Sequence, residues 1–277
     1  MTARHARTAV SYAVLVLIAA VGIAPLLYLL LLSTKTRLDV LTVPPELTFD
    51  WATIRDNYGQ VLHEKGFITF IENSLIVTIA STGIALLLGV PAAYAFSRLK
   101  FRGRSHWAST VLSFRFMPPV AVAIPIFLMI RWVGLVDTYP GLVLPYIAFS
   151  LPLVIWIMIG FFDEIPRELD DAALVDGCTR SSTLYRIMLP LARPGIMVAA
   201  TFGMIFIWNE FLVGLYIVNS SDKETIPIAA SGLLTVESPI DWNIAAGVGV
   251  LTVIPVLIFS LFVQRYIVRG ITAGAVR

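Results

Sequence analysis

The chain has 277 residues, of which 58% are hydrophobic and only 14% charged, with a formal net charge of +2 at pH 7. A soluble domain carries roughly a quarter charged residues, so this composition excludes a chain that folds in water around a single core. The apolar residues also cluster in long blocks, and the sequence therefore indicates an all-α membrane protein.

The first apolar block, residues 8–34, follows Arg4 and Arg7 and contains no Asp, Glu, Lys or Arg. A cleaved signal peptide also begins with basic residues, but its apolar core is only about 7–15 residues long. The block exceeds the roughly 20 residues that a helix needs to cross a bilayer. We therefore expect a retained first transmembrane helix, and residues 1–70 to comprise this helix and an outer segment.

Five further apolar blocks divide the rest of the chain, and each is long enough to span a bilayer. Three of them contain no charged residue, and two are each interrupted by a single charge. In chain order the blocks are residues 73–97, 105–130, 138–162, 194–221 and 242–264. The sequence thus predicts six transmembrane helices, of which five form a core over residues 71–277.

The distribution of Lys and Arg between the loops predicts the orientation. If the N-terminus lies in the cytoplasm, the cytoplasmic segments hold thirteen of the 20 basic residues and the outer segments hold six. Because cytoplasmic loops are enriched in Lys and Arg, we expect both termini, and the stretch between the fourth and fifth spans, to be cytoplasmic.

That stretch, residues 164–193, is here called the polar loop. Acidic residues crowd its first turn, where they favour the positive end of a helix dipole. Gly177 is placed to end this helix in a left-handed turn, and Thr179 is suited to cap a second short helix. The pattern predicts a helix-turn-helix at the membrane surface.

Two interpretations of the polar loop are open on physical grounds. It could rest on lipid headgroups as an interfacial linker, or it could dock on a partner protein. Its acidic first helix would be repelled by an anionic inner leaflet, and its narrow, alanine-rich apolar stripe suits a close protein neighbour. These features favour the partner protein.

Part of the polar loop resembles the EAA loop of permease subunits from bacterial ABC importers. The family pattern is Glu-Ala-Ala, three residues, Gly, nine residues, Ile, one residue and Leu-Pro. The matching residues are Asp171, Ala172, Ala173, Gly177, Ile187, Leu189 and Pro190. Asp171 is the one departure, since it keeps the charge of the usual glutamate on a side chain that is one methylene shorter.

Other segments resemble one branch of that family, the sugar-importer permeases of the maltose-importer type. They are residues 92–104, the Trp-Asn-Glu-Phe-Leu stretch at 208–212, and the tail at 264–277, which is similar to the tail of the second permease in such systems. The resemblance covers most of the chain from residue 73 onward.

The resemblance implies a permease subunit that imports a sugar, an oligosaccharide or a sugar alcohol across the bacterial plasma (inner) membrane. It also implies a second homologous permease, two ATPase subunits that hold ATP and Mg, and an extracytoplasmic solute-binding protein. The polar loop would dock in an ATPase cleft, and the tail after Gly270 would reach between the ATPases. The chain lacks a G-x-x-x-x-G-K-[ST] phosphate loop, so we expect no enzyme activity and no cofactor on the chain itself.

Arg115 and Glu210 are the two charged residues inside the predicted spans. Such residues are candidates for function, because a charge at the bilayer centre costs roughly 2.5–3.5 kcal/mol on insertion scales. The helical rise places the two about 10 Å apart in depth. A direct ion pair between them would therefore need a tilt or a break, which Pro118, Pro119 and Pro125 could supply.

Glu210 follows Trp208 and Asn209, and an aromatic ring beside amide and carboxylate groups suits a polyhydroxylated solute. These three residues and Arg115 are our candidates for the substrate pathway. The alternatives are structural: Trp208 near a lipid interface, Glu210 bonded to a neighbouring helix, and Arg115 satisfied between permease subunits.

The competing class is a self-sufficient secondary carrier or channel for a small polar solute. Such carriers often contain inverted repeats, and no repeat is visible in this sequence. The three histidines lack ligand spacing, so we expect no metal site. We expect contact with membrane lipid and none with nucleic acid.

Overall fold

The computed structural model describes residues 2–42, 48–233 and 241–274, and the regular structure in these residues is entirely helical. The expected all-α membrane fold is thereby confirmed. Two bent helix pairs raise the number of candidate spans from four to six if each pair counts as one span. The pairs are Arg104–Phe116 with Pro119–Trp132, and Arg180–Leu191 with Arg193–Trp208. The four continuous spans are Arg7–Ser33, Phe67–Arg98, Tyr139–Glu164 and Trp242–Phe262.

Residues 1–68 and 230–255 form one compact unit. Its helices are α1 (Thr2–Ser33), η1 (Asp39–Leu41), α2 (Trp51–Gly59), η2 (Gln60–Glu64) and the first part of α13 (Trp242–Gly274). The buried Asn57 side chain donates to the carbonyl oxygens of Ser33, at 3.0 Å, and of Lys35, at 2.8 Å. Asn57 also accepts a 3.0 Å hydrogen bond from Asn243. This amide pair satisfies carbonyls at the end of α1 and joins α2 to α13.

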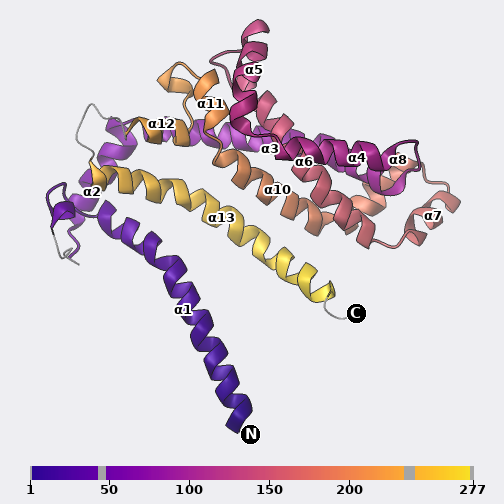
Figure 1. Ribbon diagram of the computed structural model, residues 1–277, viewed down its shortest axis with the longest axis horizontal. Helices are drawn as coiled ribbons and strands as arrows, with labels where there is room; N and C mark the ends of the chain where they lie inside the picture. Colours follow the sequence, from indigo (N-terminus) through magenta and orange to yellow (C-terminus); the bar gives the residue numbers. More distant parts are fainter. Residues whose placement is uncertain (1, 43–47, 234–240, 275–277) are drawn as a thin grey trace. The chain divides into compact units, whose positions relative to one another are not determined.

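Residues 69–229 and 256–277 form the second unit, in which α3, α6 and α10 run side by side (Figure 1). A Cβ atom at Gly195 of α10 would lie 2.4 Å from Cγ of Phe161 in α6. Small residues of this kind let transmembrane helices approach closely. The unit comprises α3 (Phe67–Arg98), α4 (Arg104–Ser113), η3 (Phe114–Phe116), α5 (Pro119–Trp132), α6 (Tyr139–Glu164), α7 (Glu168–Val175), α8 (Arg180–Thr183), η4 (Leu184–Met188), α9 (Leu189–Leu191), α10 (Arg193–Trp208), α11 (Leu212–Ile217), η5 (Ser221–Lys223) and α12 (Ile226–Gly232), of which α12 extends into the first unit.

Two of the expected spans are broken within this unit. The segments Arg104–Phe116 and Pro119–Trp132 meet at 98°. Pro118 and Pro119 stand at this bend, as the sequence predicts, whereas Pro125 lies inside α5 and does not break it. The fifth block differs from a single helix over 194–221, because α10 ends at Trp208 and α11 begins at Leu212. The Glu210 carboxylate accepts from the backbone N–H of Val213 at 2.9 Å, so this polar side chain caps the new helix.

Candidate functional site

The first half of the polar loop is α7 followed by a tight glycine turn. Gly177 has φ +84°, and its N–H donates to the carbonyl of Leu174 at 3.1 Å. The N–H of Cys178 donates to the carbonyl of Ala173 at 2.9 Å. These two hydrogen bonds make up a Schellman motif, which requires a residue that tolerates positive φ at this position.

The second half of the polar loop packs against the helical core of the second unit. The hydroxyl of Thr179 accepts from the N–H of Ser182 at 3.2 Å and caps α8. Leu184 and Met188 of the following π-helical turn, η4, are buried among side chains of α3 and α6. The η4 turn thus anchors the side of the polar loop that faces α3 and α6, and the opposite side of the loop is exposed.

The seven predicted docking residues are divided between these two sides. Ala173 is buried, and Ile187 and Leu189 are half-buried. The remaining four, Asp171, Ala172, Gly177 and Pro190, are exposed. Large apolar side chains flank them on the exposed side, with Val175 88% and Tyr185 59% accessible. Glu168, Asp176, Arg180 and Arg186 are exposed as well, so the exposed side of the loop combines charges of both signs with apolar side chains.

A buried ion pair that sequence reasoning missed ties the polar loop to α3. Nε of Arg98, the last residue of α3, lies 3.1 Å from Oδ2 of Asp170 in α7, and both side chains are nearly inaccessible, at 3% and 4%. The hydroxyl of Tyr94 donates to Oδ1 of Asp170 at 2.9 Å. Arg98 also donates to the carbonyls of Phe162 and Ile165, at 2.6 and 2.5 Å.

This cluster of Tyr94, Arg98 and Asp170, here called the loop clamp, escaped notice because each charge looked ordinary in its own segment. Arg98 fits the positive-inside pattern, and Asp170 fits an acidic first helical turn. The two acidic neighbours differ in burial: Asp170 is buried and Asp171 is exposed. Consecutive residues in a helix are rotated by about 100° around its axis, so Asp170 and Asp171 lie on different faces of α7. This difference was the one signal in the sequence that could have indicated a buried carboxylate.

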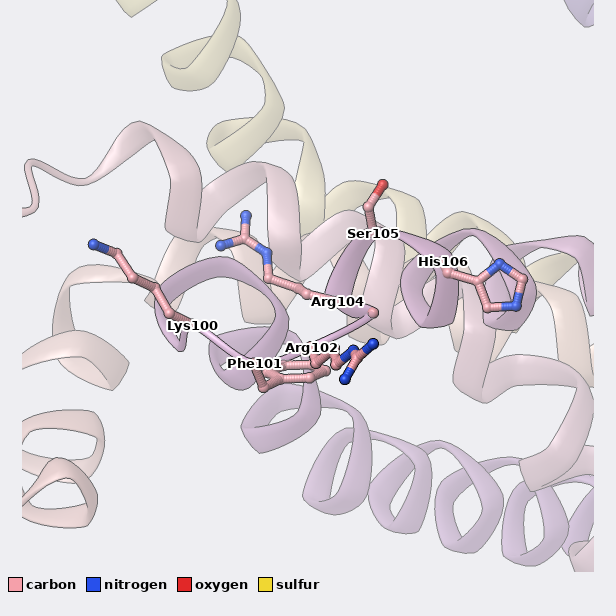
Figure 2. A pocket seen from close by; sticks show the side chains of 7 residues that line it. Lys100, Phe101, Arg102, Arg104, Ser105 and His106 are labelled. Atoms are coloured by element: carbon pink, nitrogen blue, oxygen red, sulfur yellow. The ribbon is translucent and has the colours of Figure 1, made fainter.

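A strongly basic segment follows α3. A hollow of about 860 Å³ is lined by Lys100, Phe101, Arg102, Gly103, Arg104, Ser105 and His106, and Figure 2 shows Lys100 and Arg102 extending from this segment in opposite directions. A neighbouring hollow of about 620 Å³ reaches the loop clamp and includes Arg167, Asp171 and Arg180. Basic side chains thus surround the junction of α3 with the polar loop.

The predicted pathway residues lie around the two helix breaks. Cζ of Arg115, in η3, sits 4.2 Å from the ring centroid of Phe206 in α10, which is a cation–π contact. Glu210 accepts from the N–H groups of Val213, at 2.9 Å, and Gly214, at 3.3 Å. Among the ion pairs of the described residues, none joins Arg115 to Glu210.

The side chains of Trp208 and Asn209 differ in burial. Trp208 is 1% exposed and meets the ring of Phe259 edge-on, with centroids 6.2 Å apart. Asn209 is exposed, and its side chain donates to the carbonyl of Ile205 at 2.7 Å. Asn209 and Glu210 help to line a hollow of about 540 Å³ together with Pro119, Val120, Phe149, Ile205, Phe206, Phe211 and Leu212. The structure therefore brings both helix breaks to one hollow, whereas the Trp208 ring is packed in the core.

The opposite end of α3 holds residues 219–226, here called the outer segment. The buried Asn73 side chain donates to the carbonyls of Asp222, at 3.0 Å, and Glu224, at 2.8 Å. Asn73 also accepts a 2.6 Å hydrogen bond from the hydroxyl of Tyr139. The hydroxyl of Ser74 accepts from the N–H of Ile226 at 2.8 Å. None of these contacts was anticipated from the sequence.

Asp137 provides a second tie to the outer segment. Its Oδ1 accepts from the N–H groups of Asn219 and Ser220, both at 3.0 Å. The Ser220 hydroxyl and these backbone donors hold the pKa of Asp137 below its ordinary value of 3.8. The carboxylate is therefore charged at neutral pH and fixes the start of the outer segment.

Two remaining predictions concern metals and the tail. Over residues 2–42, 48–233 and 241–274, no group of three His, Cys, Asp or Glu residues is placed to hold a metal ion. The helix α13 continues to Gly274, but the tail side chains from residue 265 onward lie outside the described residues. The role predicted for the tail after Gly270 stays a prediction.

Comparison with known proteins identifies relatives of the whole chain. The family described as "Binding-protein-dependent transport system inner membrane component" matches residues 85–273, a range that contains the polar loop and both helix breaks. The trehalose transport system permease protein SugB of Mycobacterium tuberculosis is 38% identical over an alignment of 279 positions, which covers 98% of this chain and 99% of SugB.

Two further comparisons extend this result. The trehalose/maltose transport system permease protein MalG of Thermococcus litoralis is 31% identical over 95% of this chain and 94% of its own length. A chain from a bacterial ABC transporter involved in the import of the acidic polysaccharide alginate has the same fold, with a TM-score of 0.79. That match covers 96% of this chain and 98% of the solved one at 24% identity.

Proposed function

The chain belongs to the family of binding-protein-dependent transport system inner membrane components, and from this premise we propose how it works. It is a permease subunit of a sugar ABC importer, a multi-pass membrane protein and not an enzyme. The alternative of a self-sufficient carrier is set aside, since relatives that match nearly the whole chain are permease proteins of transport systems. The match over residues 85–273 is the observation that carries this conclusion.

We propose that the exposed side of the polar loop docks on an ATPase subunit. The exposed Asp171 and Ala172 support this, because a carboxylate and a small side chain fit a close, basic protein surface. Val175 and Tyr185 add apolar area to be covered, and exposed apolar patches mark interaction surfaces. Buried Ala173, together with Ile187 and Leu189, then holds the loop in shape.

The assembly we propose contains a second homologous permease, two ATPases and an extracytoplasmic binding protein. ATP and Mg belong to the ATPases, because this chain has no phosphate-binding loop. Both termini and the polar loop lie in the cytoplasm, as the Lys and Arg distribution supports. Residues 71–277 supply the permease core. Residues 1–70 supply the first transmembrane helix and the stretch that follows it on the outer side.

We propose that solute passes the hollow between the two helix breaks. Asn209 and Glu210 offer amide and carboxylate groups there, and Arg115 lies nearby over Phe206. Broken helices in transporters commonly frame binding sites, because unwound backbone adds polar groups. A pathway role for the buried Trp208 requires that α10 and α13 separate during transport.

The names of two relatives make trehalose the first solute to test. Cells that lack this chain are compared with cells that regain it, and uptake of radiolabelled trehalose, maltose and a polyol is measured. The proposal expects uptake of one of these to return with the chain and to cease when ATP is depleted. Uptake that persists without ATP would contradict it.

A further inference from the structure

The helix α3 is a continuous 32-residue helix with a buried polar anchor at each end. At one end the loop clamp joins Arg98 and Tyr94 to Asp170 of the polar loop. At the other end Asn73 holds two carbonyls of the outer segment. Figure 1 shows α7 and the start of α12 at opposite ends of α3. At a rise of roughly 1.5 Å per residue, the two anchors are about 38 Å apart.

Both anchors suit the transmission of movement better than simple stabilisation. A buried ion pair is weak evidence for stability, because well-packed apolar residues often serve as well. The ion pair instead fixes the position of α7 relative to α3. Arg98 also donates to the carbonyls of Phe162 and Ile165, so its guanidinium group is held from several sides. Asn73 likewise uses both ends of its amide, with Tyr139 as the third partner.

We propose that α3 is a strut that carries displacement of the polar loop to the outer segment, with Arg98, Asp170 and Asn73 as its positioning residues. The inference rests on the proposed docking of an ATPase on the polar loop. Because the clamp holds α7 to the end of α3, a push on α7 moves α3. Because Asn73 holds the outer segment directly, that segment follows α3.

The test is hydrogen exchange, followed by mass spectrometry, of the intact complex with and without Mg-ATP and vanadate. In the wild type, nucleotide is expected to change exchange in both the polar loop and the outer segment. In Asp170→Asn, the change in the polar loop is expected to persist. The nucleotide-induced change in the outer segment is expected to fall by about fivefold or more, the lower end of typical coupling between sites.

Asn73→Ala breaks the strut at its far end and leaves the polar loop untouched, so it tests the inference even where Asp170→Asn fails to assemble. It is expected to lower the outer-segment response as much as Asp170→Asn does. The double variant should be no worse than either single variant, whereas independent sites this far apart would add. Asp163→Asn is the matched control, because Asp163 accepts a hydrogen bond from Ser97 beside the clamp and its replacement leaves the three clamp residues in place.

The outcomes separate the two proposals. If nucleotide does not change hydrogen exchange in the polar loop of the wild-type complex, the docking proposal is overturned, and the strut proposal with it. A polar loop that responds, together with an undiminished outer-segment response in Asp170→Asn or Asn73→Ala, would overturn the strut alone.

Discussion

Gly177 is the residue at which backbone conformation alone sets the shape of the polar loop. Its φ of +84° is one that side chains disfavour, yet a Cβ atom there would meet no neighbour within 4 Å. Gly177→Val therefore acts through backbone strain of about 1–2 kcal/mol and not through a clash. Since 1.4 kcal/mol is tenfold in an equilibrium, we expect uptake to fall by about tenfold while the chain still inserts.

The matched control for this prediction is Gly160→Val. Gly160 is exposed on α6, has ordinary helical φ and also has no neighbour near a new Cβ atom. Uptake and membrane levels of the two variants are measured side by side. Equal uptake by both would show that the turn at Gly177 does not matter for coupling.

Glu210 has two separable roles, as helix cap and as charge beside the hollow. Glu210→Ala removes the acceptor for the N–H groups of Val213 and Gly214, and loss of such a cap costs about 1 kcal/mol. Glu210→Gln keeps an acceptor oxygen and loses only the charge. We expect both variants to impair uptake, and Glu210→Ala alone to lower the melting temperature. Normal uptake by Glu210→Gln would reduce Glu210 to a cap.

At the scale of elements, local chemistry was predictable and long-range pairing was not. The turn at Gly177 and the cap at Thr179 follow from residues next to them, and both are present. The loop clamp joins residues 98 and 170, and no local pattern reports such a pair. The break after Trp208 was hidden because the apolar block continues on both sides of it, although Asn209 and Glu210 marked the place.

The outer segment depends on the ionisation of Asp137. Because the folded-state pKa of Asp137 lies below its ordinary value, the carboxylate contributes stability above pH 3.8, and this contribution is lost as pH falls through the folded-state pKa. We expect the protection of the Asn219 and Ser220 amides, relative to an unstructured amide at the same pH, to fall below pH 3.8. In Asp137→Ala the exchange should be fast at neutral pH as well. A wild-type profile in that variant would refute the tie.

At the scale of the molecule, the orientation is tested by the single cysteine of the sequence. Cys178 lies in the polar loop and is partly exposed. A membrane-impermeant maleimide should leave it unlabelled in intact cells. The same reagent should label it in inverted vesicles that have been washed free of peripheral ATPases, and Cys178→Ser should show no labelling in either. Labelling in intact cells would place the polar loop on the outer side.

The docking surface is also a property of the whole molecule. The surface that we propose to dock includes the apolar side chains of Val175 and Tyr185, which are exposed in the isolated chain, and the sequence matches a family of transport-system components over 85–273. The chain therefore has the surface of a subunit, and the sequence indicated this through the EAA-like spacing.

The central claim is that this chain works as one subunit of an ATP-driven importer. The most direct test is to tag the chain, extract it from its native membrane in mild detergent and identify the copurifying proteins by mass. The account predicts a second permease and a nucleotide-binding ATPase. Recovery of the chain alone, or only as a self-associated oligomer from an intact preparation, would contradict it.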